Sequence, residues 1–282
     1  MSKIEWTDRT WNPTTGCDQI SRGCDNCYAM TLARRLKAMG QPKYQNDGDP
    51  RTSGPGFGLT LHPDTLNDPY TWRTPQMVFV NSMSDLFHAR VPLDFVRRVI
   101  EVIEQTPQHT YQILTKRASR LPKVADKLTW PPNLWMGISV EDADHLDRVD
   151  DLRCVPAAAR FLSCEPLVGP LDGIDLTGID WVIVGGESGA KASPMHPDWA
   201  RSLRDKCQQA KIPYFFKQWG SWAPTGKVGL GQPLPGEIFA GDPDDQGWRV
   251  EMRRVAKKSA FRELDGRTWD EFPQPHHRRE VA

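Results

Sequence analysis

Short apolar runs recur along the middle of the chain, and each is followed by a polar turn. The runs consist almost entirely of aliphatic, β-branched and aromatic residues, which is typical of strands in a parallel sheet buried on both faces. They lie at residues 77–81, 111–115, 134–139, 160–163, 181–184 and 214–217. A further short strand is expected near residues 3–6.

Helical patterns fill the intervals between these runs. Val96, Val99, Ile100 and Ile103 fall at helical spacing and predict a helix over residues 92–105. Similar patterns predict helices at residues 29–38, 117–127, 143–151 and 197–210. Strands that alternate with helices indicate about six or seven βα units. Periodicity does not distinguish a barrel from a doubly wound sheet.

Two segments depart from this alternation. Residues 41–75 are rich in Gly, Pro, Asn and Asp, so we expect an insertion that lies over one face. From Trp219 onward the pattern is irregular, with one small helix expected near residues 251–260. The chain is long enough for a single α/β barrel domain. We therefore expect a domain at 1–220 and an irregular extension at 221–282 that packs on it.

Composition limits the kinds of partner that the chain is expected to bind and its expected location in the cell. No segment approaches the roughly 18 consecutive apolar residues of a membrane helix, and the first residues lack the layout of a signal peptide. We expect a cytoplasmic protein without a membrane span. Lys+Arg and Asp+Glu number 36 each, so contact with nucleic acid requires a local basic patch. Basic and aromatic residues interleave at 34–51 and 116–123, as a nucleic-acid surface or simply as a solvated face.

The cysteines are distributed unevenly. Cys17, Cys24 and Cys27 fall within eleven residues, whereas the other three, Cys154, Cys164 and Cys207, lie far apart and are expected to be buried and structural. In a reducing cytosol, clustered thiols indicate a metal or a cluster rather than a disulfide framework. Three thiolates on one loop can bind three irons of a 4Fe–4S cluster and leave the fourth iron open.

Structural zinc and unliganded thiols are the alternatives for the clustered cysteines. Zinc needs a fourth ligand, yet no further cysteine occurs before Cys154 and the first histidine is His62.

Polar residues end most of the predicted strands. Ligand sites of parallel βα folds lie where strands end, so these side chains predict a shared pocket, with helix capping as the alternative for each. The set comprises Ser82, Ser84, Asp85, Thr115, Lys116, Ser139, Glu141, Asp142, Ser163, Glu165, Glu187, Ser188, Lys217 and Gln218. A glycine turn at 185–189 allows the backbone to approach a ligand closely. Lys116 and Lys217 are suited to holding a carboxylate or phosphate.

Cys17-x6-Cys24-x2-Cys27-Tyr28, set before a predicted helix, resembles the cluster motif of the radical S-adenosylmethionine (SAM) superfamily. That superfamily usually has the spacing C-x3-C-x2-C. This chain differs in its longer first gap and in Asn26, which stands where an aromatic residue is common. Segments 81–85 and 113–117 resemble parts of the spore photoproduct lyase branch. The chain is also similar to a phage-associated, poorly characterised family with a three-cysteine signature. The superfamily likeness covers roughly residues 1–220.

The resemblance implies an α/β fold, a partial (β/α)6-type TIM-like barrel with an N-terminal cluster loop and an irregular C-terminal extension. It implies a 4Fe–4S cluster on Cys17, Cys24 and Cys27, SAM as second cofactor and an external electron donor. The implied reaction is SAM cleavage to a 5′-deoxyadenosyl radical, for repair or modification of a nucleobase or nucleic acid. The residues expected to bind SAM are Ser82, Ser84, Asp85, Lys116, Ser139, Glu141, Glu165, Gly186, Glu187 and Lys217.

Two other functions remain open. One is a non-enzymatic zinc or iron–sulfur protein that binds nucleic acid or a partner. The other is a metal-dependent hydrolase or nuclease that uses the strand-end Asp and Glu, with structural cysteines.

Overall fold

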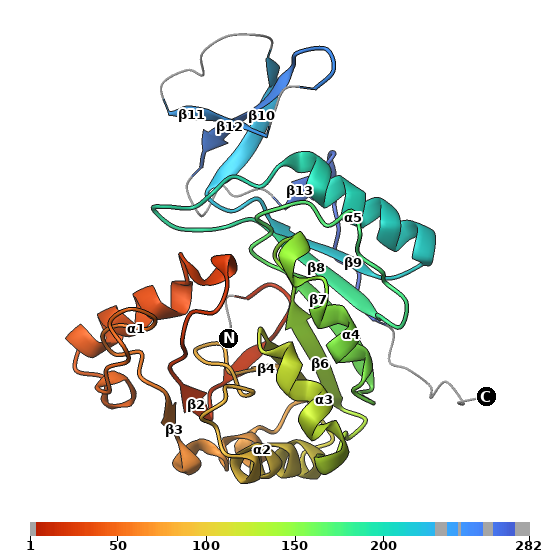
Figure 1. Ribbon diagram of the computed structural model, residues 1–282. Coiled ribbons are helices and arrows are strands. Elements are labelled where there is room, and N and C mark those ends of the chain that lie inside the picture. The colour runs from red at the N-terminus through yellow and green to blue at the C-terminus, as the bar shows by residue number, and fades with distance from the viewer. Residues whose placement is uncertain (1–3, 229–235, 242–243, 256–261, 274–282) are drawn as a thin grey trace. The chain divides into compact units, whose positions relative to one another are not determined.

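A computed structural model describes residues 4–228, 236–241, 244–255 and 262–273 (Figure 1). It divides into two compact units: a first unit of residues 4–139 and 147–162, and a second unit of residues 140–146 and 163–273. Each unit is described by itself. No helix among the described residues is both long and apolar enough to cross a membrane.

A seven-stranded sheet is the main element of the fold. Its strands are β1 (Arg9–Trp11), β4 (Met77–Val80), β5 (Thr110–Thr115), β6 (Leu134–Ser139), β7 (Ala159–Cys164), β8 (Trp181–Gly185) and β9 (Tyr214–Gln218), in that order across the sheet. The pairs β1–β4, β4–β5, β5–β6 and β8–β9 are parallel. All six apolar runs are therefore strands, which confirms the predicted partial-barrel α/β class.

The longest helices are confirmed within one residue. They are α1 (Tyr28–Ala38), α2 (Leu93–Gln105) and α5 (Pro197–Ala210). The helix predicted at 117–127 is instead a short α3 (Leu121–Val124) between two 3-10 turns. Pro122 accounts for this break, because proline has no N–H to donate and fits only the first turn of an α-helix. The helix predicted at 143–151 is a 3-10 turn followed by α4 (Arg148–Arg153).

The strand expected near residues 3–6 is wrong, since the sheet begins with β1 at Arg9. Trp6 is instead a core side chain, 3% exposed, with its ring 4.7 Å from that of Phe79. In the insertion at 41–75, β3 (Thr60–Leu61) pairs with β2 (Thr14–Thr15) in antiparallel fashion. The insertion is thus joined to the segment that precedes the first cysteine.

The C-terminal part of the second unit contains strands. β10 (Trp222–Val228), β12 (Arg249–Arg254) and β11 (Glu237–Ala240) form an antiparallel sheet in that order, followed by a hairpin of β13 (Glu263–Leu264) and β14 (Arg267–Thr268). The helix expected at 251–260 is wrong over 251–254, and residues 256–260 lie outside the described residues. Val250 and Met252 are both buried, which is the period-two pattern of a strand.

Candidate functional site

The three clustered cysteines lie on one loop between β2 and α1. Cys24 ends the 3-10 turn Arg22–Cys24, and Cys27 is the residue directly before α1. All three are free thiols; Cys24 is buried, and Cys17 and Cys27 are partly exposed. Cys24 is close enough to each of the other two for its charge to raise their pKa values. We call residues 16–27 the cysteine loop.

Contacts of Gly16 attach the cysteine loop to the end of β4. The Gly16 N–H donates to the Met83 carbonyl (3.0 Å), and the Ser84 hydroxyl donates to the Gly16 carbonyl (2.6 Å). Gly16 has a φ of +83°, and a Cβ at this position would lie 2.2 Å from the Gly58 carbonyl oxygen. Only glycine fits here, because the backbone is left-handed and a second segment passes against it. Cys17 is thereby placed beside the first polar strand end.

Substituting Gly16 with alanine tests this attachment. We expect Gly16→Ala to lower the free energy of unfolding by about 1–3 kcal/mol, because left-handed strain and a backbone clash act together. The matched control is Gly40→Ala, where φ is +72° but no atom lies within 4 Å of the added Cβ. Urea denaturation of the metal-free protein should show a loss of only about 1 kcal/mol for the control. Equal losses for the two variants would contradict the close approach of Gly58.

Asp85 is the centre of a buried network that joins the ends of β4 and β5. Its carboxylate accepts hydrogen bonds from the Thr115 hydroxyl (2.8 and 2.9 Å) and from the backbone N–H groups of Phe87 (2.9 Å) and Lys116 (3.1 Å). It also pairs with the Arg117 guanidinium at 3.1 Å. The Asp85 carboxylate, 7% exposed, therefore acts within the protein as a junction between two strand ends.

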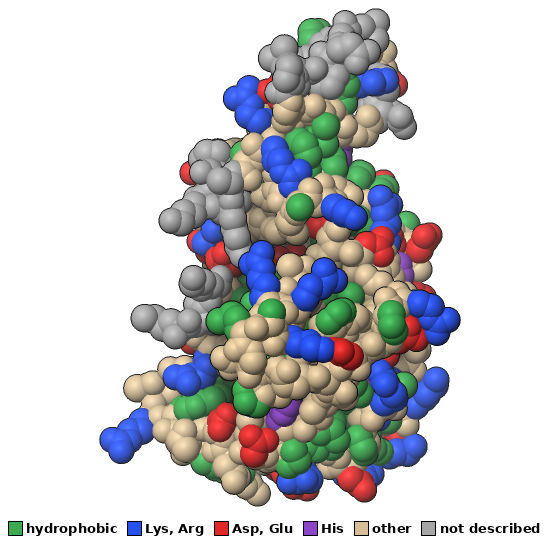
Figure 2. All heavy atoms as spheres, turned by 90° about the vertical axis from the view of Figure 1, so that its left-hand side faces the viewer, with side chains coloured by type: hydrophobic (Ala, Val, Ile, Leu, Met, Phe, Trp, Pro, Cys, Tyr) green, Lys and Arg blue, Asp and Glu red, His purple; other side chains and the backbone are tan. Residues whose placement is uncertain are grey.

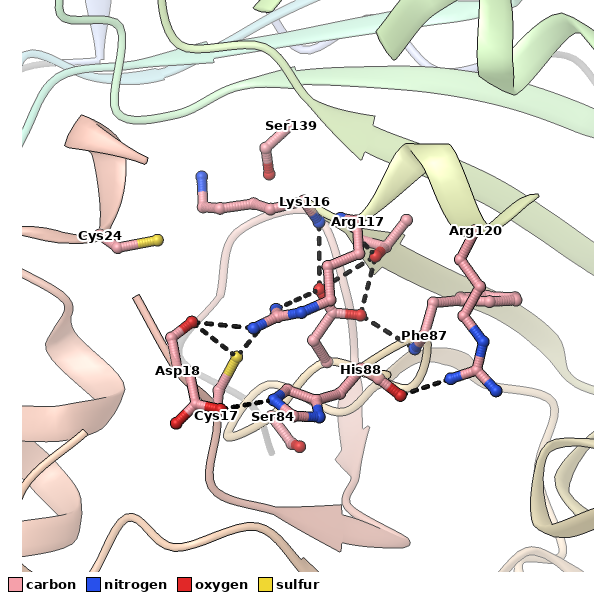
Figure 3. A network of polar contacts seen from close by, with 12 residues as sticks. Cys17, Asp18, Cys24, Ser84, Phe87, His88, Lys116, Arg117, Arg120 and Ser139 are labelled. Carbon is pink, nitrogen blue, oxygen red and sulfur yellow. Dashed lines mark hydrogen bonds and ion pairs between the residues drawn. The ribbon is translucent and has the colours of Figure 1, made fainter. Parts of the chain in front are cut away.

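The Arg117 guanidinium also reaches the cysteine loop (Figure 3). Its Nη1 donates to the Cys17 Sγ at 3.1 Å, and its Nη2 donates to the Asp18 carbonyl at 2.9 Å. The Arg117 side chain is only 13% exposed. A single arginine thus links a candidate iron ligand to the strand-end network.

A second network holds the residue that follows Cys17. The Asp18 carboxylate accepts from His88 Nε2 (2.8 Å), Arg90 Nη2 (2.9 Å) and the Ser53 hydroxyl (2.5 Å). Burial alone would raise the pKa of Asp18, but hydrogen bonds from Ser53 and His88 and the charge of Arg90 lower that pKa to about 2. The cysteine loop is therefore held by contacts of Gly16 on one side of Cys17 and of Asp18 on the other.

Burial raises the pKa of the Cys17 thiol to about 12, and the charge of Asp85 acts in the same direction while Arg117 opposes it. Burial also raises the pKa of Cys27, while the charge of Lys116 lowers it. Without metal, these thiols are protonated at neutral pH. Binding a metal therefore releases protons, as thiolate ligation requires.

The donor set fits an open cluster better than it fits zinc. Among the described residues, no three His, Cys, Asp or Glu side chains converge as a single metal ion requires. Around zinc every sulfur lies about 2.3 Å from one ion, so the sulfurs crowd together. In a cubane cluster each cysteine binds a different iron, so the sulfurs stand further apart. Three cysteines on one loop supply the number of thiolates that such an open cluster takes.

The structure brings four of the predicted cofactor residues of the first unit to the cysteine loop. Ser84 and Asp85 anchor the loop as described, and the Ser82 carbonyl accepts the Tyr28 hydroxyl at 2.5 Å. Lys116 is near enough to Cys27 for its charge to act on that thiol. The fifth, Ser139, is buried at the end of β6, and Figure 3 draws it beside Lys116.

The remaining predicted residues lie in the second unit. Glu165 and Lys217 form an ion pair at 2.6 Å, and the Glu187 carboxylate accepts from the Ser193 N–H at 2.7 Å. Glu141 is buried, with His145 Nδ1 3.8 Å from its carboxylate. A Cβ on Gly186 would lie 2.0 Å from the Trp219 carbonyl oxygen, so the protein's own backbone already requires glycine there.

Several side chains of the predicted basic rim form hydrogen bonds or ion pairs with other residues of the chain. Arg120 donates to the carbonyls of His88 and Val91, and Lys37 and Arg51 pair with neighbouring aspartates. Arg34 and Arg35 are exposed on α1, which carries no acidic residue. Figure 2 shows a face on which Lys and Arg side chains are scattered among hydrophobic ones rather than gathered into one basic field.

Sequence reasoning missed Asp18 and His88, and it placed Cys154 wrongly. Cys154 is exposed because it lies at the C-terminal cap of α4, whereas Cys164 and Cys207 are buried as predicted. The adjacency of Asp18 to Cys17 was the one available signal for the missed network.

Residues 1–273 match the family described as a protein of unknown function, DUF5131. The chain belongs to this family. A comparison with curated proteins finds no match.

Solved structures of spore photoproduct lyase are similar to the chain at low identity. A double mutant with bound AdoMet and dinucleoside spore photoproduct is 11% identical with a TM-score of 0.42, and the match covers 86% of this chain and 67% of that one. A complex with dinucleoside spore photoproduct is 11% identical with a TM-score of 0.40, covering 84% and 66%. The chain thus spans about two thirds of these lyase chains.

Proposed function

We propose that the chain is a radical SAM enzyme whose cluster is held by Cys17, Cys24 and Cys27. The observation that carries the proposal is the cysteine loop: three free thiols within residues 17–27, on a loop that is attached beside the polar ends of β4 and β5. A 4Fe–4S cluster with an open iron supplies the coordination site and the electron for reductive cleavage of SAM to methionine and a 5′-deoxyadenosyl radical.

The chain's own residues bind and orient the reactants. Because Ser84 and Asp85 contact the cysteine loop or the residues that hold it, their proposed role is to fix that loop. Ser82, Lys116 and Ser139 remain proposed for SAM at the strand ends of the first unit, and Glu141, Glu165, Gly186, Glu187 and Lys217 at those of the second.

A nucleobase or nucleic acid is the proposed substrate, for repair or modification. Its support is the sequence resemblance and the exposed Arg34 and Arg35, which suit phosphate contacts. Reductive cleavage consumes an electron, so an external electron donor is part of the proposal.

The decisive test uses the full chain, purified without oxygen. It should be brown, absorb broadly near about 400 nm and contain about four irons per chain. Dithionite and SAM together should then yield 5′-deoxyadenosine and methionine, measured by chromatography with mass detection, and omitting dithionite should abolish both. Colourless protein with one zinc would instead support a zinc-binding role. A full cluster that never cleaves SAM would overturn the enzymatic assignment.

A further inference from the structure

Arg117 donates a hydrogen bond to a cysteine of the loop. Its Nη1 lies 3.1 Å from the Cys17 Sγ. The residue was expected only to contribute to a basic rim, yet its guanidinium is almost entirely enclosed, with 13% of the side chain exposed. A buried cation that donates a hydrogen bond to this sulfur would affect how readily a cluster bound there is reduced.

Two contacts hold Arg117 independently of the sulfur. Asp85 pairs with Nη1 at 3.1 Å, and the Asp18 carbonyl accepts from Nη2 at 2.9 Å. Asp85 is in turn fixed by Thr115 and by the backbone of Phe87 and Lys116. Because the planar guanidinium is clamped at both Nη atoms, it stays directed at Cys17.

Hydrogen bonds to cluster sulfurs and the local net charge set the reduction potential of an iron–sulfur cluster. Reduction adds negative charge, so a fixed donor and cation beside a ligating sulfur stabilise the reduced form more than the oxidised form. Water would screen an exposed cation, but the buried Arg117 is screened far less. Arg117 therefore favours one-electron reduction of the cluster.

We propose that Arg117 is a positioning residue that hydrogen-bonds the Cys17 sulfur and raises the reduction potential of the cluster. This inference rests on the proposed function. It concerns the one-electron reduction by the external donor, which precedes any cleavage of SAM. Asp85 sets the orientation of the Arg117 guanidinium. The hydrogen bond from Arg117 then acts on the Cys17 sulfur.

The test is a potentiometric titration of the loaded full chain without SAM, followed by the electron paramagnetic resonance signal of the reduced cluster. Arg117→Gln should reduce the equilibrium constant for one-electron reduction about tenfold, equivalent to about 59 mV. Arg117→Lys keeps the charge but loses the planar fork, so it should shift the potential in the same direction by less. Iron content and the melting temperature of the metal-free protein are measured in parallel.

Arg120→Gln is the matched control. Arg120 lies three residues further along the chain, donates to the carbonyls of His88 and Val91, and is close enough to Asp85 for the two charges to interact. Arg120→Gln removes a cation near Asp85 that donates to two carbonyls and not to the Cys17 sulfur, so its potential should shift by less than that of Arg117→Gln.

The outcomes separate the two proposals. If Arg117→Gln loads about four irons and its potential is unchanged, the role of Arg117 is overturned while the enzymatic proposal stands. If Arg117→Gln fails to fold or load, Arg117→Lys decides, and an unchanged potential overturns the role equally. Wild-type protein that takes up no cluster overturns the proposed function and this inference together.

Discussion

Replacing Cys24 with alanine is expected to abolish cluster binding and 5′-deoxyadenosine formation together. Cys24 is the buried member of the three clustered thiols. Two thiolates do not retain a cubane cluster that three hold in an open site. Iron per chain and the absorption near about 400 nm should fall to background, and 5′-deoxyadenosine production should fall with them.

Cys154→Ala provides the control for this variant. Cys154 is exposed at the end of α4 and far from the loop in sequence. The control should hold the same iron and produce 5′-deoxyadenosine at the wild-type rate. Metal-free Cys24→Ala should melt close to metal-free wild type, so that lost iron is not confused with unfolding. A Cys24→Ala protein with a full, active cluster would refute the assignment of Cys24.

The parallel strands were predictable from sequence because burial on both faces leaves a continuous apolar run. The apolar run at 134–139 indicated a strand, and the helical spacing of α2 indicated a helix. Errors arose where local patterns compete. Residues 249–254 alternate with period two, but the segment contains three arginines, one glutamate and one methionine, which also suit a helix. Burial of Val250 and Met252 against Trp222 decides for a strand, and that contact is not local.

The candidate site was predictable only in part for the same reason. Close spacing within one loop identifies Cys17, Cys24 and Cys27 as candidate ligands. The contact between Arg117 and Cys17 joins residues 100 positions apart, and that between His88 and Asp18 joins residues 70 apart. Such pairs depend on the register of β1, β4 and β5, which a single sequence does not specify. Sequence therefore located the candidate ligands, and tertiary structure revealed which residues contact the loop that carries them.

Replacing Asp85 with alanine should lower the free energy of unfolding of the metal-free protein by about 3–5 kcal/mol, because a buried guanidinium loses its carboxylate. The change also leaves the buried Thr115 hydroxyl and two backbone N–H groups without their acceptor. Asp85→Asn keeps an acceptor but not the charge, so its loss should be smaller. Urea denaturation followed by circular dichroism measures each variant.

Asp94→Ala is the control for Asp85, because Asp94 also pairs with an arginine, Arg97, at 2.6 Å but its side chain is 87% exposed. Solvent screens that pair, so the control should stay within about 0.5 kcal/mol of wild type. The contrast separates a buried junction from a surface ion pair. Equal stability of Asp85→Ala and Asp94→Ala would show that the ends of β4 and β5 are held without Asp85. Arg117 would then lack the support that directs it at Cys17, and the proposed control of the reduction potential would lose its structural basis.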